Sequence, residues 1–275
     1  MALLNERLWH VSDADLEFLI RTASPGATDI WGLKRMLRED AAVRTAFLQD
    51  DRVIKRVMED EQVLLRISPK LYFEILLRQA ARDLKQVSYT LETTSTMRIP
   101  VFDSHELADL LEQERVLLYL ADMLASFTRV TSYTLAIRVR EGLWRKIRFN
   151  DLDLSSLIQL CEFADEEYQL GVYKRIGDIC LFILGMFPEY AAHDYRYPFS
   201  GQLRPHLRGK VRISPEEYAR QGRKFYQLAA DHQAAQALEL SGTFQDLHDH
   251  FLQAQKPLTF IADHYLAVKK HHFFG

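Results

Sequence analysis

SPKLYFEILLRQAARDLKQV, residues 68–87, decides the fold class, because it has the marks of a long amphipathic helix. Ser68 supplies a capping hydroxyl and Pro69 takes the first helical position, which is a favoured order at a helix start. One apolar stripe follows at helical spacing: Tyr72, Ile75, Leu76, Ala80, Leu84 and Val87. Glu74 and Arg78 lie four residues apart, and we expect them to pair on the solvent side of this helix.

Helix starts and stripes of this kind recur over most of the chain. Ser12 and Thr28 can each cap a helix, and Ser214-Pro215-Glu216-Glu217 has the form of a capping box. Besides 68–87, the expected helices are 12–22, 28–38, 104–112, 114–127, 155–169, 172–187, 214–231, 243–255 and 257–270, the last with Pro257 at its first position.

The apolar run 179–187 is expected to be a buried central helix, because it is apolar on all sides. Gly171, Gly177 and Gly185 fall within the same helical region. Small residues at such positions indicate close packing between helices rather than a catalytic loop.

A ten-residue repeat runs between residues 39 and 68. Three sets of side chains recur with this period: Asp40, Asp50 and Asp60; Val43, Val53 and Val63; Phe47, Val57 and Ile67. Ten residues make just under three helical turns, so each unit is expected to be a short helix with an acidic residue at its positive end. The pattern resembles the short-helix modules of Hop-type co-chaperones but lacks their Asn-Pro and Asp-Pro starts. Ordinary capped amphipathic helices are therefore the preferred interpretation.

Residues 132–149, SYTLAIRVREGLWRKIRF, depart from the helical pattern and predict a β-hairpin, because strand side chains alternate faces with a period of two. The turn is expected at Glu141-Gly142. The tetrapeptide SYTL occurs at 88–91 and again at 132–135, which reflects either a duplicated helix–hairpin–helix unit or coincidence. The expected fold class is mainly α: a multi-helix globular domain with one or two β-hairpins that form a small antiparallel sheet.

Four segments are expected along the chain. They are an N-terminal short-helix region (1–67), a helix–hairpin–helix core (68–190), a basic aromatic loop (191–213) and a C-terminal helical hairpin (214–275). The alternative is that all four fold as one compact domain.

Two basic zones stand out in a chain whose net charge is −3. The outward face of the hairpin holds Arg138, Arg140, Trp144, Lys146 and Arg148. The loop and the helix after it hold Arg204, Arg208, Lys210, Arg212, Arg220 and Lys224. Local cation clusters of this kind indicate an anionic partner, and the tryptophan offers a stacking surface. The plainer interpretation is a solvated surface whose arginines pair with acidic helices such as residues 162–167.

The composition is that of an ordinary globular protein, with 48% hydrophobic and 27% charged residues. The longest apolar run, 179–187, is too short to span a membrane. The N-terminus lacks the apolar run of a signal peptide. Cys161 and Cys180 both lie in apolar helical patterns, so we expect buried thiols and a cytoplasmic location.

The sequence carries no nucleophile elbow, phosphate-binding loop or HExxH motif. His248 and His250 would point in different directions on a helix, whereas Asp246 and His250 could converge. We expect no catalytic residue, no metal and no cofactor.

The preferred function is a non-catalytic helical scaffold or adaptor that presents its basic surface to a protein or other anionic partner. The alternative is a nucleic-acid-binding or regulatory protein that uses the Arg/Trp hairpin. An enzyme of unidentified chemistry comes third, and a homo-oligomer is compatible with each of these functions.

Overall fold

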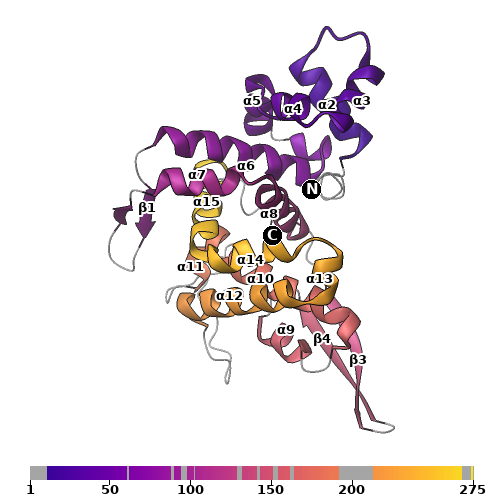
Figure 1. Ribbon diagram of the computed structural model, residues 1–275, viewed down its shortest axis with the longest axis vertical. Helices are drawn as coiled ribbons and strands as arrows, with labels where there is room; N and C mark the ends of the chain where they lie inside the picture. The colour runs from indigo at the N-terminus through magenta and orange to yellow at the C-terminus, as the bar shows by residue number, and fades with distance from the viewer. Residues whose placement is uncertain are drawn as a thin grey trace. The chain divides into compact units, whose positions relative to one another are not determined.

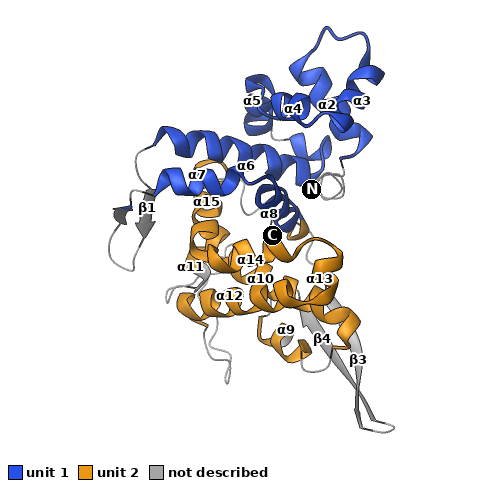
Figure 2. Cartoon of the chain, viewed as in Figure 1, with its two compact units in different colours: residues 1–125 blue, residues 126–275 orange. Residues whose placement is uncertain are grey.

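The computed structural model describes residues 11–60, 62–87, 90–93, 98–101, 103–128, 132–140, 143–150, 154–161, 164–191, 213–267 and 274. The chain divides into two compact units, residues 1–125 and 126–275 (Figure 2). Within the residues described, none of the helices has the length and hydropathy that a membrane span requires.

The first unit begins with a group of short helices (Figure 1): α2 (Asp13–Ala23), α3 (Ile30–Glu39), α4 (Ala41–Leu48), α5 (Asp51–Glu59) and the 3-10 turn η1 (Val63–Leu65). Their boundaries follow the ten-residue repeat. Asp40 and Asp50 accept backbone N–H groups in the first turns of α4 and α5, and Asp60 accepts one at the start of η1. The expectation of short helices with acidic starts is confirmed for α4 and α5, whose capping carboxylates satisfy N–H groups that have no partner within the helix. The third unit forms only the three-residue turn η1. The cap of α3 is Asp29 rather than the expected Thr28.

A buried aspartate joins the starts of two helices. Ser12 caps α2 in a reciprocal box with Asp15, as expected for Ser12. The second carboxylate oxygen of Asp15 accepts the backbone N–H of Ser68 at 2.6 Å, and Ser68 caps α6 (Pro69–Gln86). The predicted start of α6 at Ser68-Pro69 is confirmed.

The ion pair on α6 lies in the interior rather than on the solvent side, so that expectation is wrong. Both Glu74 and Arg78 are buried, and Arg78 Nη2 lies 2.8 Å from Glu74 Oε1. The reason is a second carboxylate: Glu114 opens α8 (Glu114–Ser126), and its Oε1 lies 2.6 Å from the same nitrogen. A charged pair can be buried when its remaining donors find partners. The helix before it, α7 (Ser104–Glu112), has the bounds expected from the sequence and packs against α6.

The second unit is built around α10 (Glu166–Met186). Its other helices are α9 (Leu154–Cys161), α11 (Pro188–Ala191), α12 (Pro215–Asp231), α13 (Gln233–Ala237), α14 (Ser241–Asp249) and α15 (Phe251–His264). Residues 176–186 of α10 are buried, and α12 and α15 pack against this helix. The expectation of a buried central helix is confirmed.

Glycines allow the closest approaches to α10. A Cβ atom at Gly177 would lie 2.7 Å from the Tyr226 ring, and one at Gly185 would lie 2.6 Å from Leu258 Cβ. Close helix packing is therefore confirmed at these two positions. It is wrong for Gly171, which is exposed and would meet nothing within 4 Å.

Pro257 lies inside α15 and is buried, so its expected place at a helix start is wrong. Proline removes one backbone hydrogen bond from a helix interior. Two side chains flank this position and bind the end of α10. Gln255 Nε2 donates to the Leu184 carbonyl at 3.2 Å, and Thr259 Oγ1 donates to the Gly185 carbonyl at 3.0 Å.

The expected fold class is wrong in its β part. The part of the chain whose side chains the structure describes is mainly α, and no β-hairpin or sheet belongs to that part. The backbone pairs β1 (Thr90–Thr93) with β2 (Arg98–Val101) and β3 (Ser132–Arg140) with β4 (Leu143–Asn150), as two separate antiparallel pairs. The side chains of β3 and β4 lie outside the described residues. A period-two alternation predicts extended backbone but not a sheet, because an isolated pair of strands is at best marginally stable in water.

Candidate interaction surface

The predicted basic residues fall into three groups. The first group belongs to β3 and β4, and its side chains lie outside the described residues: Arg138, Arg140, Trp144, Lys146 and Arg148. The second group falls within 192–212, which also lies outside the described residues: Arg204, Arg208, Lys210 and Arg212. Arg220 and Lys224 lie on α12, and both are exposed. The described part of the predicted surface is therefore the outer face of α12.

The start of α12 follows from its sequence. Ser214 accepts the backbone N–H of Glu217 at 3.2 Å, and Pro215 takes the first helical position. The serine cap is confirmed. The Glu217 side chain binds Arg220 and Gln221 instead of completing the predicted capping box. The apolar stripe of α12, which includes Tyr218 and Phe225, faces the unit's interior and leaves the cations outside.

Tight contacts fix α12 to its neighbours. A Cβ atom at Gly222 would lie 2.4 Å from the Phe251 ring, so the helix approaches α15 as closely as its backbone allows. The Tyr226 hydroxyl donates to Asp178 Oδ1 at 3.0 Å, and Lys174 Nζ donates to Asp178 Oδ2 at 2.7 Å. Tyr226 and Asp178 are buried, and their hydrogen bond joins α12 to α10. The outer face is thus carried by a helix that is held in one position.

The outer face holds three cations within five residues, Arg220, Arg223 and Lys224, all of them exposed. Arg220 makes two hydrogen bonds to Glu217, with Nη2 at 2.7 Å and Nε at 2.9 Å. Gln221 and Arg220 together hold the pKa of the Glu217 carboxyl below its usual value. Lys224 Nζ lies 5.5 Å from the centre of the Phe225 ring.

Arg223 belongs to the same basic run of the sequence and is exposed on α12 beside Arg220 and Lys224. Its backbone carbonyl lies 2.8 Å from His248 Nδ1 of α14. This contact uses the backbone and leaves the guanidinium on the surface. We refer to Arg220, Arg223 and Lys224 as the α12 cationic face.

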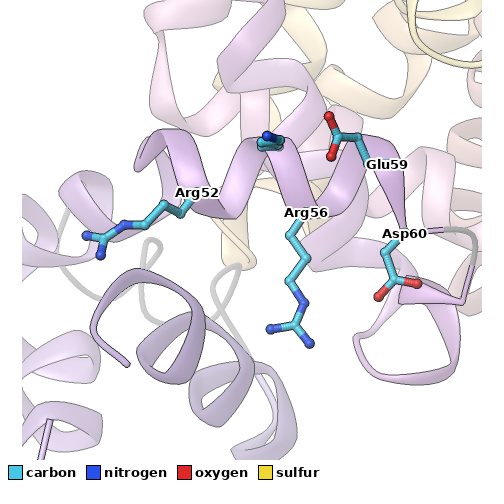
Figure 3. A pocket seen from close by; sticks show the side chains of 5 residues that line it. Arg52, Arg56, Glu59 and Asp60 are labelled. Atoms are coloured by element: carbon cyan, nitrogen blue, oxygen red, sulfur yellow. The ribbon is translucent and has the colours of Figure 1, made fainter. Parts of the chain in front are cut away.

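A second cationic region surrounds a pocket on α5, lined by Arg52, Lys55, Arg56, Glu59 and Asp60. Its charges are mixed, and Figure 3 shows Arg52 and Arg56 pointing in different directions. Arg52 pairs with its own helix cap Asp50, and Arg56 donates to Thr22 at 3.1 Å. These side chains do not converge on a common point, so we do not assign a ligand to this pocket.

Three of the described histidines, at positions 232, 248 and 264, make hydrogen bonds within the structure. His232 caps α13, and His264 Nδ1 lies 3.0 Å from the Phe260 carbonyl one turn earlier. Within the residues described, no three His, Cys, Asp or Glu side chains are placed to hold a metal ion. Cys180 is buried as expected, whereas Cys161 is only half-buried, so the expectation for Cys161 is wrong.

Comparison with known proteins gives no match: no family model, no curated protein and no solved structure is significantly similar to this chain.

Proposed function

We propose that this chain is a non-catalytic helical adaptor whose α12 cationic face binds an acidic surface of a protein partner. The observation that carries the proposal is the placement of Arg220, Arg223 and Lys224 on one exposed helix whose other side is locked into the unit. Cations held on a rigid element lose little conformational freedom when a partner binds. A cytoplasmic location fits this role and remains a prediction.

Acids on the same helix favour a protein over a nucleic acid as the partner. Glu217 pairs with Arg220, and Glu216 and Asp231 are exposed near the two ends of the helix. A polyanion laid along this face would meet these carboxylates as well as the cations. A folded protein can place a few carboxylates against the cations and avoid the acids.

The test is affinity capture with a charge-reversed chain. The variant Arg220→Glu/Arg223→Glu/Lys224→Glu should lose a partner that the unchanged chain retains, because like charges repel across an interface. The matched control is Arg52→Glu/Lys55→Glu, which reverses exposed cations on α5 and should retain the partner. The captured protein is then produced alone, and its direct binding is measured by calorimetry.

Two results would reject the proposal. In one, the triple variant binds the purified partner as tightly as the unchanged chain does. In the other, the captured material is removed by nuclease, which would select the nucleic-acid alternative that rests on Arg138, Arg140, Trp144, Lys146 and Arg148.

A further inference from the structure

The outward face of α3, in the first unit, exposes a tryptophan beside an arginine. Trp31 is 72% exposed and Met36 is 47% exposed, while Leu37 of the same helix is fully buried. The guanidinium carbon of Arg35 lies 5.2 Å from the centre of the Trp31 ring, within the range of a cation–π contact. Leaving so large an apolar side chain in water is unfavourable, so this surface calls for an explanation.

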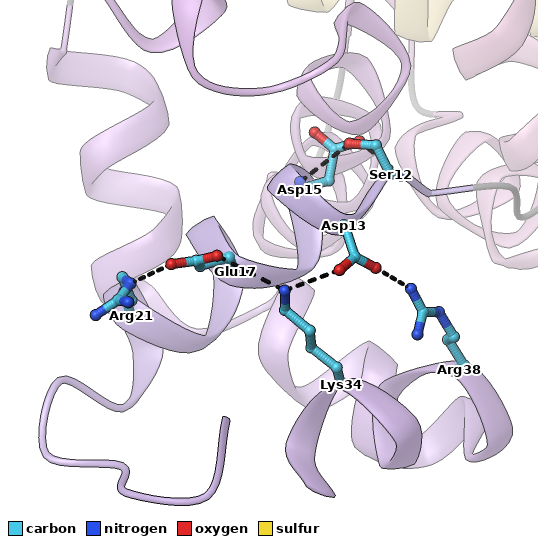
Figure 4. A network of polar contacts seen from close by, with 7 residues as sticks. All are labelled: Ser12, Asp13, Asp15, Glu17, Arg21, Lys34 and Arg38. Carbon is cyan, nitrogen blue, oxygen red and sulfur yellow. Dashed lines mark hydrogen bonds and ion pairs between the residues drawn. The ribbon is translucent and has the colours of Figure 1, made fainter. Parts of the chain in front are cut away.

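A cap at its start and two ion pairs along one side hold α3 in place. Asp29 accepts the backbone N–H of Gly32 at 2.8 Å, and a Cβ atom at Gly32 would lie 2.2 Å from the Asp29 carboxylate. Glycine therefore makes room for the cap. Lys34 and Arg38 both reach from α3 to Asp13 of α2, as Figure 4 shows. The indole thus lies on a helix that is capped at its start and bound to α2 along one side.

The cations of α3 divide into two kinds. Lys34 and Arg38 both pair with Asp13. Their hydrogen bonds lower the pKa of the Asp13 carboxyl, with Lys34 making the larger contribution. Arg35 lies between them in the sequence, and its described contact is with the Trp31 ring. The face therefore offers one guanidinium and one indole side by side.

We propose that this Trp31–Arg35 face is a docking site for a segment of a protein partner that places a carboxylate beside a large apolar side chain. The planar guanidinium matches a carboxylate through two parallel hydrogen bonds. The indole supplies the apolar surface for the neighbouring side chain. Tryptophan and arginine are also the residues most enriched at energetic centres of protein interfaces. This proposal is independent of the α12 cationic face, which lies in the other unit.

The surrounding charges distinguish this partner from a nucleic acid. Arginine and tryptophan would also suit a phosphate and a stacked base. However, the other cations of α2 and α3 already have carboxylate partners: Lys34 and Arg38 pair with Asp13, and Arg21 pairs with Glu17. A chain of phosphates needs several available cations, whereas a single carboxylate needs only the guanidinium of Arg35.

The experiment selects binders from a random 12-residue peptide library displayed on phage, using the full chain as bait. The expected binders contain Asp or Glu next to Leu, Phe or Trp. A consensus peptide is then labelled, and its Kd is measured by fluorescence anisotropy. The change Trp31→Ala and the change Arg35→Glu should each raise the Kd at least tenfold, while circular dichroism shows an unchanged helical spectrum.

Matched controls separate this site from other surfaces. Leu252→Ala removes another exposed apolar side chain, and Arg52→Glu reverses another exposed arginine; both should leave the Kd within twofold. The triple α12 variant should also bind the peptide normally, so failure of one proposal does not imply failure of the other. Failure to enrich any peptide, enrichment of basic peptides, or a Kd that does not respond to Trp31→Ala would overturn the inference.

Discussion

Replacing Arg78 by methionine is expected to lower the free energy of unfolding by about 3–5 kcal/mol, the usual cost of removing one partner from a buried ion pair. The side chain of Glu74 is fully buried, and that of Arg78 is 6% exposed. Arg78 gives Glu74 two hydrogen bonds, at 2.8 and 3.1 Å, and also binds Glu114. Methionine would fill much of the arginine's volume but would leave the Glu74 carboxylate without these donors. Urea denaturation followed by circular dichroism measures the loss.

The first unit contains a matched control for this experiment. Glu17 and Arg21 form the same Glu-to-Arg pair at the same spacing, but their side chains are 42% and 64% exposed. The change Arg21→Met should therefore cost only about 0.2–1 kcal/mol. Adding Glu74→Leu to Arg78→Met should recover part of the lost stability, because the Glu74 carboxylate is then no longer buried without Arg78, although the buried Arg44 loses the attraction of Glu74. A loss below about 1 kcal/mol for Arg78→Met, or one equal to that of Arg21→Met, would refute the reasoning.

Four further predictions concern the second unit. Gly222→Ala should destabilise it by about 1–3 kcal/mol, because the new Cβ would overlap the Phe251 ring. Gly171→Ala should stabilise it by about 0.5–1 kcal/mol, because this helical position is open. Thermal unfolding should show a lower melting temperature for the first variant and a higher one for the second. A thiol reagent should modify the half-buried Cys161 readily and Cys180 only on unfolding. Since burial raises the pKa of Cys180, stability should fall as the pH rises above 9.0. Leu181→Ala should cost about 2–5 kcal/mol in urea denaturation, and a loss under 1 kcal/mol would place α10 at a surface.

Local features of the fold could be predicted from the sequence because they depend on neighbouring residues. The caps at Ser12, Ser68 and Ser214 and the aspartate repeat all satisfy backbone N–H groups within three residues of themselves. Such contacts need no knowledge of the rest of the chain. Residues 179–187 could also be placed in the core, because a helix that is apolar on every side has no solvent face.

Features that depend on distant residues could not be predicted. The burial of Arg78 depends on Glu114, which is 36 residues further along the chain. Pro257 looked like a helix start, but its helix begins six residues earlier and is held by contacts to α10. Of the candidate site, the exposure of Arg220 and Lys224 follows from helical periodicity, whereas Trp31 was not singled out. Its signal was a tryptophan four residues before an arginine on one capped helix.

The central claim, that the α12 cationic face contacts an acidic protein surface, is tested most directly by site-specific photo-crosslinking. A benzophenone side chain at position 227, one turn beyond Arg223 and Lys224, should crosslink to the captured partner when irradiated. The crosslinked partner peptide should be rich in Asp and Glu. The same group at position 171, on the exposed start of α10, should give no such product. A partner that remains bound but crosslinks equally from both positions, or through a peptide without acidic residues, would contradict the account.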